Sequence, residues 1–414
     1  MVGLFGSPEE DRPVKKFRLG IILELPVEVG GGFQQSLNEI LWLQRWAASA
    51  DIEAPVYSTL GANVAPLRDF GIEAKLLRLG WRDRLFLFLK YSGVFDLLQY
   101  ALRAVPQFEK RLIGDGVDIA YFTTTSNWHL ALYKLPFAIT VYDNCHRDSP
   151  EFDEVREFAE FERREMLFRS ACTKAAIVIA NAREIIDALV RRYSMDRERA
   201  VCIPFSPSPY VDRAVRDTTD DGTVLAKYGI EPGYLFYPAQ FWSHKNHATV
   251  LSALVLLQKR GTSKRLVLCG SDRGARDMVE ALIVRLGLTD QVRILGFVPS
   301  SELAALYRGA AALVMASYFG PTNLPPLEAW SFGTPVIYPQ AFAAQAGDAA
   351  LLFDYDSPNS LVEAIIALES PEVRSRLAEA GKARLQHFAR QADEGHRHFA
   401  DLIRRLRYRR GYLM

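Results

Sequence analysis

Residues 317–335 read Ser317-Tyr-Phe-Gly-Pro-Thr-Asn-Leu-Pro-Pro-Leu-Glu-Ala-Trp-Ser-Phe-Gly-Thr-Pro335 and lie between two short apolar runs, 311–316 and 336–338. Apolar runs of this length predict buried strands, and the loop rich in Gly and Pro exposes backbone donors. We expect a helix to begin near Pro325, because proline is favoured in the first helical turn, and its dipole would point at the loop. The stretch therefore predicts a strand, a rigid loop, a helix and a second strand, as in a parallel sheet.

The same alternation of apolar runs and amphipathic stretches extends along the chain from Phe17. Strands separated by helices predict parallel βαβ units. The segment 204–232 breaks the rhythm with Pro204, Pro207 and Pro209 and then the acidic stretch 217–222, so we interpret it as a surface linker. The pattern predicts two doubly wound α/β domains with a cleft between them. The expected strands are 18–24, 117–122, 137–142, 175–180, 200–203, 234–238, 266–269, 292–295, 311–316, 336–338 and 350–353, with helices over 34–50 and most of 370–410.

Composition excludes several classes of function. The 414 residues include 50 Lys+Arg and 49 Asp+Glu, and a net charge of +1 provides no overall field to attract nucleic acid. The 4 cysteines form no CxxC pair, which excludes a zinc ribbon or redox pair and is typical of a reducing cytoplasm. Residues 1–11 are acidic where a signal peptide is basic, and every apolar run is far shorter than the ~20 residues of a spanning helix. We therefore expect a soluble cytoplasmic protein.

A glycine-rich turn, Gly30-Gly31-Gly32, follows the first expected strand. Glycine lets a ligand approach the backbone closely, and the N-terminus of the following helix offers unpaired N–H groups to an anion. The alternative is a flexible turn without a ligand. The turn is not GxGxxG and has no acidic residue at the expected place about 20 positions on, which disfavours a dinucleotide site.

Lys245 follows the strand expected at 234–238. Ligands of open α/β sheets bind at the carboxyl ends of strands, where a lysine can neutralise a phosphate as a point charge. The alternatives are a solvated lysine, or a metal pair formed by His244 and His247. The metal pair is disfavoured because no carboxylate or third histidine lies nearby in sequence.

Two acidic features of the second half are open to alternative interpretations. Glu328, expected in the first turn of the helix near Pro325, could accept two hydrogen bonds from a sugar diol. Alternatively it only complements the helix dipole, a contribution of about 0.3–1 kcal/mol. Asp354-Tyr-Asp356 has the DxD form of metal-dependent transferases, but it follows the strand expected at 350–353, so we interpret it as a turn.

Taken together, these motifs resemble the donor-binding half of retaining GT-B glycosyltransferases of family 4. The resemblance covers nearly the whole second half, in order and at family spacing, whereas the first half matches more loosely through Gly31-Gly32, 140–143 and His146-Arg147. The motifs of the second half are Leu324-Pro-Pro-Leu-Glu328-Ala, Gly333-Thr-Pro-Val336, Lys245-Asn-His247, Leu295-Gly-Phe-Val-Pro299, Asp348-Ala-Ala-Leu-Leu-Phe-Asp354 and Ala380-Gly381-Lys-Ala-Arg-Leu-Gln-His-Phe388.

The resemblance implies a GT-B fold, with two Rossmann-like domains facing a central cleft. The implied parts are an acceptor-side domain at 17–205, a linker at 206–231, a donor domain at 232–388, and a C-terminal helix at 389–414 that packs back on the first domain. Metal is not expected, because family members hold the diphosphate with protein groups, and the nucleotide sugar is a substrate rather than a cofactor.

The resemblance also implies roles for individual residues. Lys245 would contact the donor diphosphate and Glu328 the ribose hydroxyls, while Gly31 and Gly32 would approach the diphosphate from the other side. Backbone groups of Thr322, Asn323 and Leu324 would meet the phosphates and sugar, and Gly296, Phe297 and Val298 would pack on the base.

Three departures from the family pattern change this site. Position 320 is Gly where the family has a second glutamate, Gln240 replaces the usual arginine, and Tyr142 stands where a histidine is common. The amides and side chains of 321–323 would then compensate in part. The best first-half candidates for orienting the acceptor or the transferred sugar are Asp143, His146 and Arg147, and Gln240 stays a candidate donor contact.

The resulting hypothesis is a retaining hexosyltransferase that acts on a glycan or lipid-linked acceptor in cell-surface polysaccharide assembly. A catalytically weak binding or scaffold subunit and a GT-B sugar-nucleotide epimerase are the alternatives. The apolar stretch 81–105 either forms a core helix pair or grips a lipid-linked acceptor at the inner face of the membrane. The basic tail 404–410 either touches anionic lipid or is a solvated helix end. The sequence leaves the donor, the linkage and the oligomeric state open.

Overall fold

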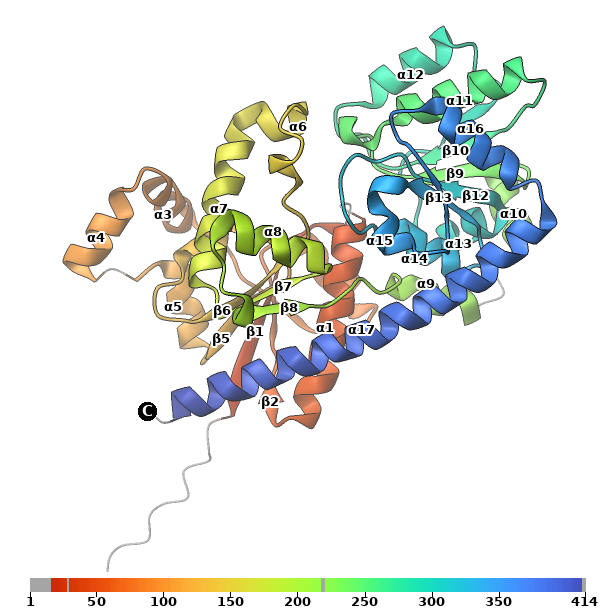
Figure 1. The fold of residues 1–414 in the computed structure, drawn as a ribbon. Helices are drawn as coiled ribbons and strands as arrows, with labels where there is room; N and C mark the ends of the chain where they lie inside the picture. Colours follow the sequence, from red (N-terminus) through yellow and green to blue (C-terminus); the bar gives the residue numbers. More distant parts are fainter. Residues whose placement is uncertain (1–15, 28–29, 104, 217–219, 412–414) are drawn as a thin grey trace, which may run out of the picture.

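The computed structural model describes residues 16–27, 30–103, 105–216 and 220–411. Within these residues the chain forms two parallel sheets, each covered by helices on both faces, and one long helix that runs along both (Figure 1). This is the doubly wound arrangement that the alternating pattern predicts. The prediction about a signal peptide in 1–11 and part of the acidic stretch 217–222 lie outside the described residues.

The first sheet has eight strands in the order β4-β3-β1-β5-β6-β7-β8, with β2 paired to β1. Its central strands are apolar at nearly every position because helices cover both faces, as in β6 and β7, where each residue is buried. The strands are β1 Phe17–Leu23, β2 Ile52–Glu53, β3 Val56–Ser58, β4 Ala74–Leu76, β5 Ile119–Phe122, β6 Phe137–Val141, β7 Ile177–Ala180 and β8 Ala200–Cys202. The helices are α1 Gly31–Ser49, α2 Val64–Arg68, α3 Trp81–Tyr91, α4 Val94–Leu102, α5 Gln107–Gly114, α6 Asp153–Arg156, α7 Glu160–Lys174 and α8 Arg183–Tyr193.

The second sheet has six strands in the order β11-β10-β9-β12-β13-β14, all parallel. The strands are β9 Tyr234–Pro238, β10 Leu266–Cys269, β11 Val292–Ile294, β12 Ala310–Val314, β13 Val336–Pro339 and β14 Leu351–Phe353. The helices are α11 His247–Lys259, α12 Arg276–Arg285, α13 Ser300–Gly309, α14 Leu324–Ser331, α15 Ala343–Ala346 and α16 Pro358–Ala367. Two more helices, α9 Pro209–Arg216 and α10 Asp221–Lys227, lie in the segment interpreted as a surface linker.

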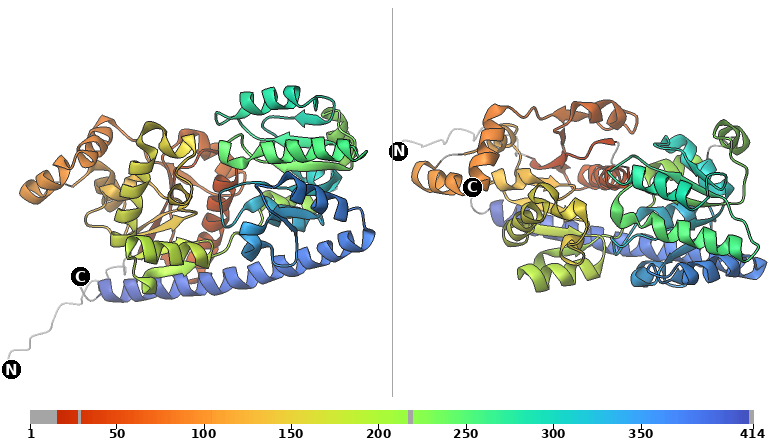
Figure 2. Two further views of the ribbon diagram at one scale, coloured as in Figure 1. Left: turned by 45° about the horizontal axis from the view of Figure 1, so that its top comes forward. Right: turned by 90° about the horizontal axis from the view of Figure 1, so that it is seen from above.

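The long helix α17, Pro371–Gly411, packs on both domains (Figure 2). It is unbroken across position 389, where a separate helix was expected to begin, and Figure 2 shows it lying along both domains. A Cβ at Gly381 would stand 2.7 Å from the ring of Trp330 on α14, and a Cβ at Gly395 would collide with the carbonyl of Cys202 at β8. Further along, Phe399 and Ile403 are buried in the core that contains β1. Glycine at these two positions lets α17 approach both domains closely.

Sequence patterns missed three short strands, β2, β3 and β4, because segments of two or three residues are too short to show a periodicity. They form strands here because β1 and β3 supply backbone partners. Helix α1 also begins at Gly31, three residues before its expected start. No helix of the described residues combines the length and apolar character needed to cross a bilayer.

Candidate functional site

Contacts between loops at the carboxyl ends of the two sheets define the cleft. An added Cβ at Gly31, which begins α1, would lie 3.6 Å from Leu324, which begins α14. Asn181, just after β7, donates a hydrogen bond to the hydroxyl of Thr322, and Glu154 of α6 accepts from His244 at 2.6 Å. A small apolar cluster of Cys145, Val155 and Phe319 also crosses the cleft. The sequence-predicted loops of both domains therefore meet in this conformation.

Gly31 and Gly32 are the first two residues of α1 rather than part of the preceding turn. The cap, Gly30, has a φ of 70°, and the first intrahelical backbone bond reaches it from Gln34. The amides of residues 31–33 therefore have no helical acceptor, which is the usual condition of a helix start that binds an anion. Leu324 lies across the cleft from Gly31. The contact of Gly31 and Gly32 with a diphosphate stays a prediction.

Lys245 ends a short 3₁₀ helix, Ser243–Lys245, that follows β9. The residue is half-buried, and its ammonium lies 3.4 Å from the hydroxyl of Ser317. Burial lowers the pKa of Lys245 to about 8, and the nearby carboxylate of Asp143 from the first domain opposes that shift. Lys245 and Asp143, both predicted from the sequence, are thus electrostatic neighbours across the cleft.

The three candidates from the first domain, Asp143, His146 and Arg147, differ in burial and in hydrogen-bond partners. Asp143 is half-buried at the end of β6, where its carboxylate accepts from the Cys145 amide at 3.1 Å. His146 has no exposed surface, because it stacks on Phe168 and its Nε2 lies 2.9 Å from Glu165. The guanidinium of Arg147 also binds Glu165 and holds the pKa of that carboxyl down at about 2.

The expectation that His146 orients a sugar is therefore corrected. A fully buried ring bonded to Glu165 cannot contact a substrate in this conformation, and burial lowers the pKa of His146. Tyr142, at the position where a histidine is common, instead donates from its hydroxyl to the carbonyl of Thr123 at 2.8 Å. Asp143 is the first-domain candidate that remains at the cleft.

The loop before α14 is held by its own hydrogen bonds. Gln345 accepts from the Asn323 amide at 2.7 Å and donates to the Asn323 carbonyl at 2.6 Å. The Asn323 side chain donates to the Gly320 carbonyl at 2.9 Å and to the Tyr338 hydroxyl at 2.6 Å. Gln345 therefore already binds the backbone groups of Asn323 that were predicted to contact the nucleotide sugar. Of the first three residues of α14, Leu324 alone has an amide N–H, because Pro325 and Pro326 follow.

Gly320 explains one departure from the family pattern. Its φ of 92° lies in the left-handed region, and a Cβ there would stand 3.1 Å from the Asn323 side-chain oxygen. A glutamate at this position would need a strained backbone and a displaced Asn323. The shape of the loop therefore excludes the second glutamate from position 320.

Glu328 lies in the second turn of α14, and the first turn contains no acidic residue. The interpretation that it only complements the helix dipole is therefore wrong. Its carboxylate is buried and accepts hydrogen bonds from the hydroxyls of Ser208 and, at 2.7 Å, Tyr307. Burial raises its pKa. A ribose diol would have to displace or share the Ser208 contact.

The predicted base-binding stretch follows β11. Gly296 has a φ of 68°, Val298 is buried, and the Phe297 ring is 57% exposed. An exposed aromatic face at the carboxyl end of a strand can stack on a base. Gln240 accepts a hydrogen bond from the Trp242 indole at 3.1 Å, in the loop after β9.

The interpretations that involve a metal are not supported by side-chain placement. His247 is buried against the rings of Tyr237 and Phe241, and burial lowers its pKa to about 3. His244 is held by Glu154 instead. Asp354 and Asp356 form the expected turn, in which the Asp356 amide donates to Asp354 at 3.0 Å. The described residues contain no group of three or more His, Cys, Asp or Glu side chains suited to a metal ion.

Sequence reasoning missed the partners of the predicted residues. Ser208 lies in the segment interpreted as a linker, and neither Tyr307 nor Gln345 belongs to a motif, so no local signal identified them. Asn181 directly follows an expected strand, 175–180, and this position at a carboxyl end was a usable signal.

Comparison with known proteins agrees with this geometry. Residues 225–384 match the family model of glycosyl transferases group 1. A D-inositol 3-phosphate glycosyltransferase of Corynebacterium glutamicum is 25% identical over 268 residues, covering 61% of this chain and 62% of that protein. The O-antigen chain mannosyltransferase B of Escherichia coli is 27% identical over 207 residues, covering 49% and 54% of the two chains. The chain thus spans about three fifths of the length of the first relatives it matches.

Solved structures extend the likeness to the whole fold. Anabaena HepE in complex with UDP and glucose superposes with a TM-score of 0.67 at 16% identity, covering 93% of this chain and 100% of that chain. WaaG, a glycosyltransferase involved in lipopolysaccharide biosynthesis, has a TM-score of 0.62 at 16% identity over 89% and 95% of the two chains. The chain therefore has the GT-B fold of these structures, and its second domain is similar to the group 1 glycosyl transferases.

Proposed function

We propose that this protein transfers a hexosyl group from a nucleotide diphosphate sugar to a glycan or lipid-linked acceptor, with retention of configuration, in cell-surface polysaccharide assembly. The observation that carries the proposal is the convergence of Lys245, the start of α1 and the start of α14 on one cleft. Relatives and neighbours named for O-antigen and lipopolysaccharide synthesis support the surface-polysaccharide role.

The proposed chemistry uses the charges on the two sides of the cleft. When the sugar leaves its donor, negative charge grows on the diphosphate and positive charge grows on the sugar ring. The Lys245 ammonium and the positive ends of α1 and α14 would stabilise the diphosphate as it leaves. The Asp143 carboxylate, facing Lys245 from the first domain, would favour the positive charge on the sugar. Contacts that cross the cleft, such as the cluster around Phe319, would exclude water from the reaction.

A second candidate function is a binding or scaffold subunit with weak turnover. Three observations favour it. Position 320 is Gly where the family has a glutamate. The Asn323 amide already donates to Gln345, and the Glu328 carboxylate already accepts from Ser208. In that case the cleft would bind nucleotide without transferring sugar. A GT-B epimerase would convert a nucleotide sugar without needing an acceptor.

Thermal unfolding with UDP, GDP, dTDP, ADP and CMP tests the donor side first. A nucleotide at ~100 times its dissociation constant adds roughly 2.7 kcal/mol to the free energy of unfolding, and we expect one diphosphate to do so. The matching nucleotide sugar is then incubated with and without acceptor glycans. Acceptor-dependent release of nucleotide supports transfer, release or conversion without acceptor supports the epimerase, and binding without turnover supports the scaffold. Stabilisation by none of the five would contradict the nucleotide site itself.

A further inference from the structure

Helices α3 and α4 form a hairpin that projects from the first domain on the side away from the second domain (Figure 1). Its inner side packs on the domain: Asp83, Phe86 and Phe95 are buried, and the rings of Phe86 and Phe95 meet edge to face at 4.4 Å. The expectation of a core helix pair is therefore correct for this inner side.

The outer side of the hairpin is also apolar, and nothing in the described chain covers it. Trp81, Leu85 and Phe88 follow one another at helical spacing along α3 and are 69%, 46% and 70% exposed. Leu97 and Tyr100 of α4 are 69% and 87% exposed. Seven of the fifteen exposed large apolar side chains of the described residues lie in this one hairpin: Trp81, Leu85, Phe88, Tyr91, Val94, Leu97 and Tyr100. A patch of this kind marks an interaction site rather than the scattered exposure of an ordinary surface.

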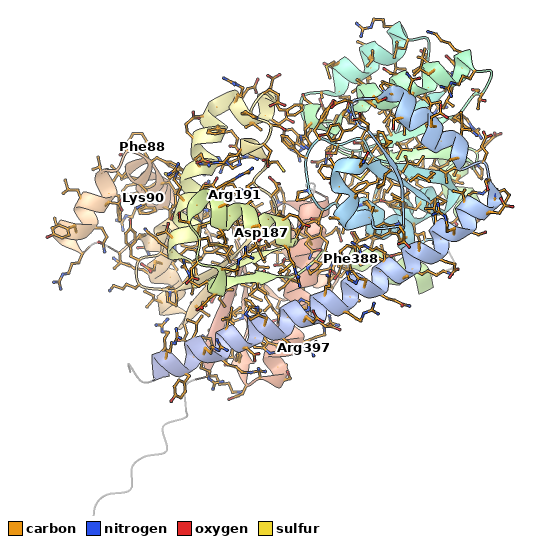
Figure 3. The ribbon with its side chains drawn as sticks, viewed as in Figure 1. Phe88, Lys90, Asp187, Arg191, Phe388 and Arg397 are labelled. Atoms are coloured by element: carbon orange, nitrogen blue, oxygen red, sulfur yellow. The ribbon has the colours of Figure 1, made fainter. Side chains whose placement is uncertain are left out.

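The charges around the hairpin point to an anionic partner. Among the described residues of 78–114 each carboxylate is already bound: Asp83 by Arg111, Asp96 by Lys90, and Glu109 by the amides of 133–135. Lys90 lies inside the hairpin with its side chain only 9% exposed, whereas Phe88 lies on the outer side (Figure 3). The cations of the same segment are exposed: Arg78, Arg82, Arg84, Arg103 and Lys110.

A second basic segment lies at the same end of the molecule. The C-terminal end of α17 lies at the same end as α4 in each view of Figures 1 and 2. Arg405 and Arg409 are exposed there, and Tyr408 is 66% exposed. Aromatic rings interleaved with arginine are typical of segments that lie at the boundary between lipid headgroups and acyl chains.

We propose that the outer side of the α3–α4 hairpin docks this protein on a membrane surface rich in anionic lipid. Trp81, Leu85, Phe88, Leu97 and Tyr100 would enter the headgroup boundary, and Arg82 and Arg84 would bind the lipid phosphates. The hairpin lies in the first domain, on the side away from the second, so docking leaves the contacts between the domains intact. Docking does not depend on the proposed transferase activity.

Co-sedimentation of the full chain with lipid vesicles, without nucleotide or acceptor, tests the proposal. One set of vesicles contains phosphatidylcholine alone and the other also contains 30% phosphatidylglycerol. We expect binding to the anionic vesicles that weakens as salt is raised, and much weaker binding to the neutral ones. The double variant Arg82→Gln, Arg84→Gln should bind the anionic vesicles about thirtyfold more weakly. Replacing both Trp81→Ser and Phe88→Ser should weaken it by on the order of 10- to 100-fold.

The matched control replaces exposed apolar residues of the second domain, Met278→Ser and Val284→Ser, which are 59% and 70% exposed. This control should bind as the wild type does, and all variants should keep the wild-type melting temperature because the replaced side chains are exposed. Absence of wild-type binding to anionic vesicles would overturn the proposal, as would variants that bind unchanged. A wild-type dimer that the hairpin variants dissociate would show that a second copy covers the patch instead. Loss of transferase activity with vesicle binding intact would refute the proposed function and leave the docking proposal standing.

Discussion

The two sides of the cleft differ in how their polar groups are satisfied. On the second-domain side, Glu328 and Asn323 are held by Ser208, Tyr307 and Gln345. On the first-domain side, the Oε1 atoms of Glu24, after β1, and Gln34, in the first turn of α1, are buried without a hydrogen-bond partner in the described chain.

This difference indicates what binding must do on each side. A buried polar atom without a partner is costly, so a ligand that supplies one gains affinity. At Glu24 and Gln34 on the first-domain side a sugar hydroxyl can add hydrogen bonds, whereas at Glu328 and Asn323 on the second-domain side the donor must exchange existing ones. Burial raises the pKa of Glu24 to about 7, partly offset by a hydrogen bond from Ser126, so this carboxyl is poised to change its charge near neutral pH.

The largest effect should come from Lys245→Gln, which removes the charge aimed at the leaving diphosphate. We expect the turnover number to fall by about 10²- to 10³-fold, the usual cost of losing one group that stabilises developing charge. The measurement is nucleotide release in the presence of acceptor. Lys259→Gln, at the exposed far end of α11, is the control and should behave as the wild type. Equal turnover in the two variants would place the diphosphate elsewhere.

Gly320→Glu restores the side chain of the family pattern and should still fail to improve the enzyme. With a φ of 92° and Asn323 close by, we expect the free energy of unfolding to fall by about 1–3 kcal/mol, with no gain in transfer. Urea denaturation measures this. Gly61→Glu is the control, because a Cβ at Gly61 meets nothing within 4 Å. A stable and more active Gly320→Glu variant would refute the account of the loop.

The pH dependence of nucleotide binding tests the charge of Lys245 directly. Its pKa of about 8 in the free protein should rise when a diphosphate binds, so binding takes up a proton. Affinity should therefore be highest below pH 8 and fall about tenfold between pH 7 and pH 9. Isothermal titration calorimetry of the wild type and of Lys245→Gln separates this effect from titration of the nucleotide, which both share. The same decrease in both proteins would exclude Lys245 as its source.

Ser208→Ala tests whether the donor must exchange a bond at Glu328. The variant loses the hydroxyl that Glu328 binds, so the free energy of unfolding should fall by about 1–3 kcal/mol. Nucleotide affinity should rise several-fold, because the ribose no longer competes with Ser208. Ser301→Ala, exposed on α13, is the control for both measurements. Weaker nucleotide binding by Ser208→Ala would mean that the serine itself contacts the donor.

The smallest effect should come from Glu24→Gln on the first-domain side. If Glu24 binds an acceptor hydroxyl, the KM for the acceptor should rise about 2- to 12-fold while nucleotide affinity stays unchanged. Glu73→Gln, exposed in the same domain, should change neither. A change in nucleotide affinity with no change in the KM for the acceptor would mean that Glu24 contacts the donor. The proposed difference between the two sides of the cleft would then be wrong.

The sequence by itself determined the two parallel sheets, most of their strands and the loops that carry Lys245, Glu328 and Asp143. It did so because buried parallel strands have continuous apolar sequences and because the loops at their carboxyl ends carry distinctive residues. Tertiary structure alone decided which predicted groups are available. His146 is buried by Phe168 and Glu165, Asn323 is bound by Gln345, and Glu328 is bound by Ser208, 120 residues earlier in the chain. Such pairs join segments that are 19 to 120 residues apart in the chain, and no local pattern of residues encodes them.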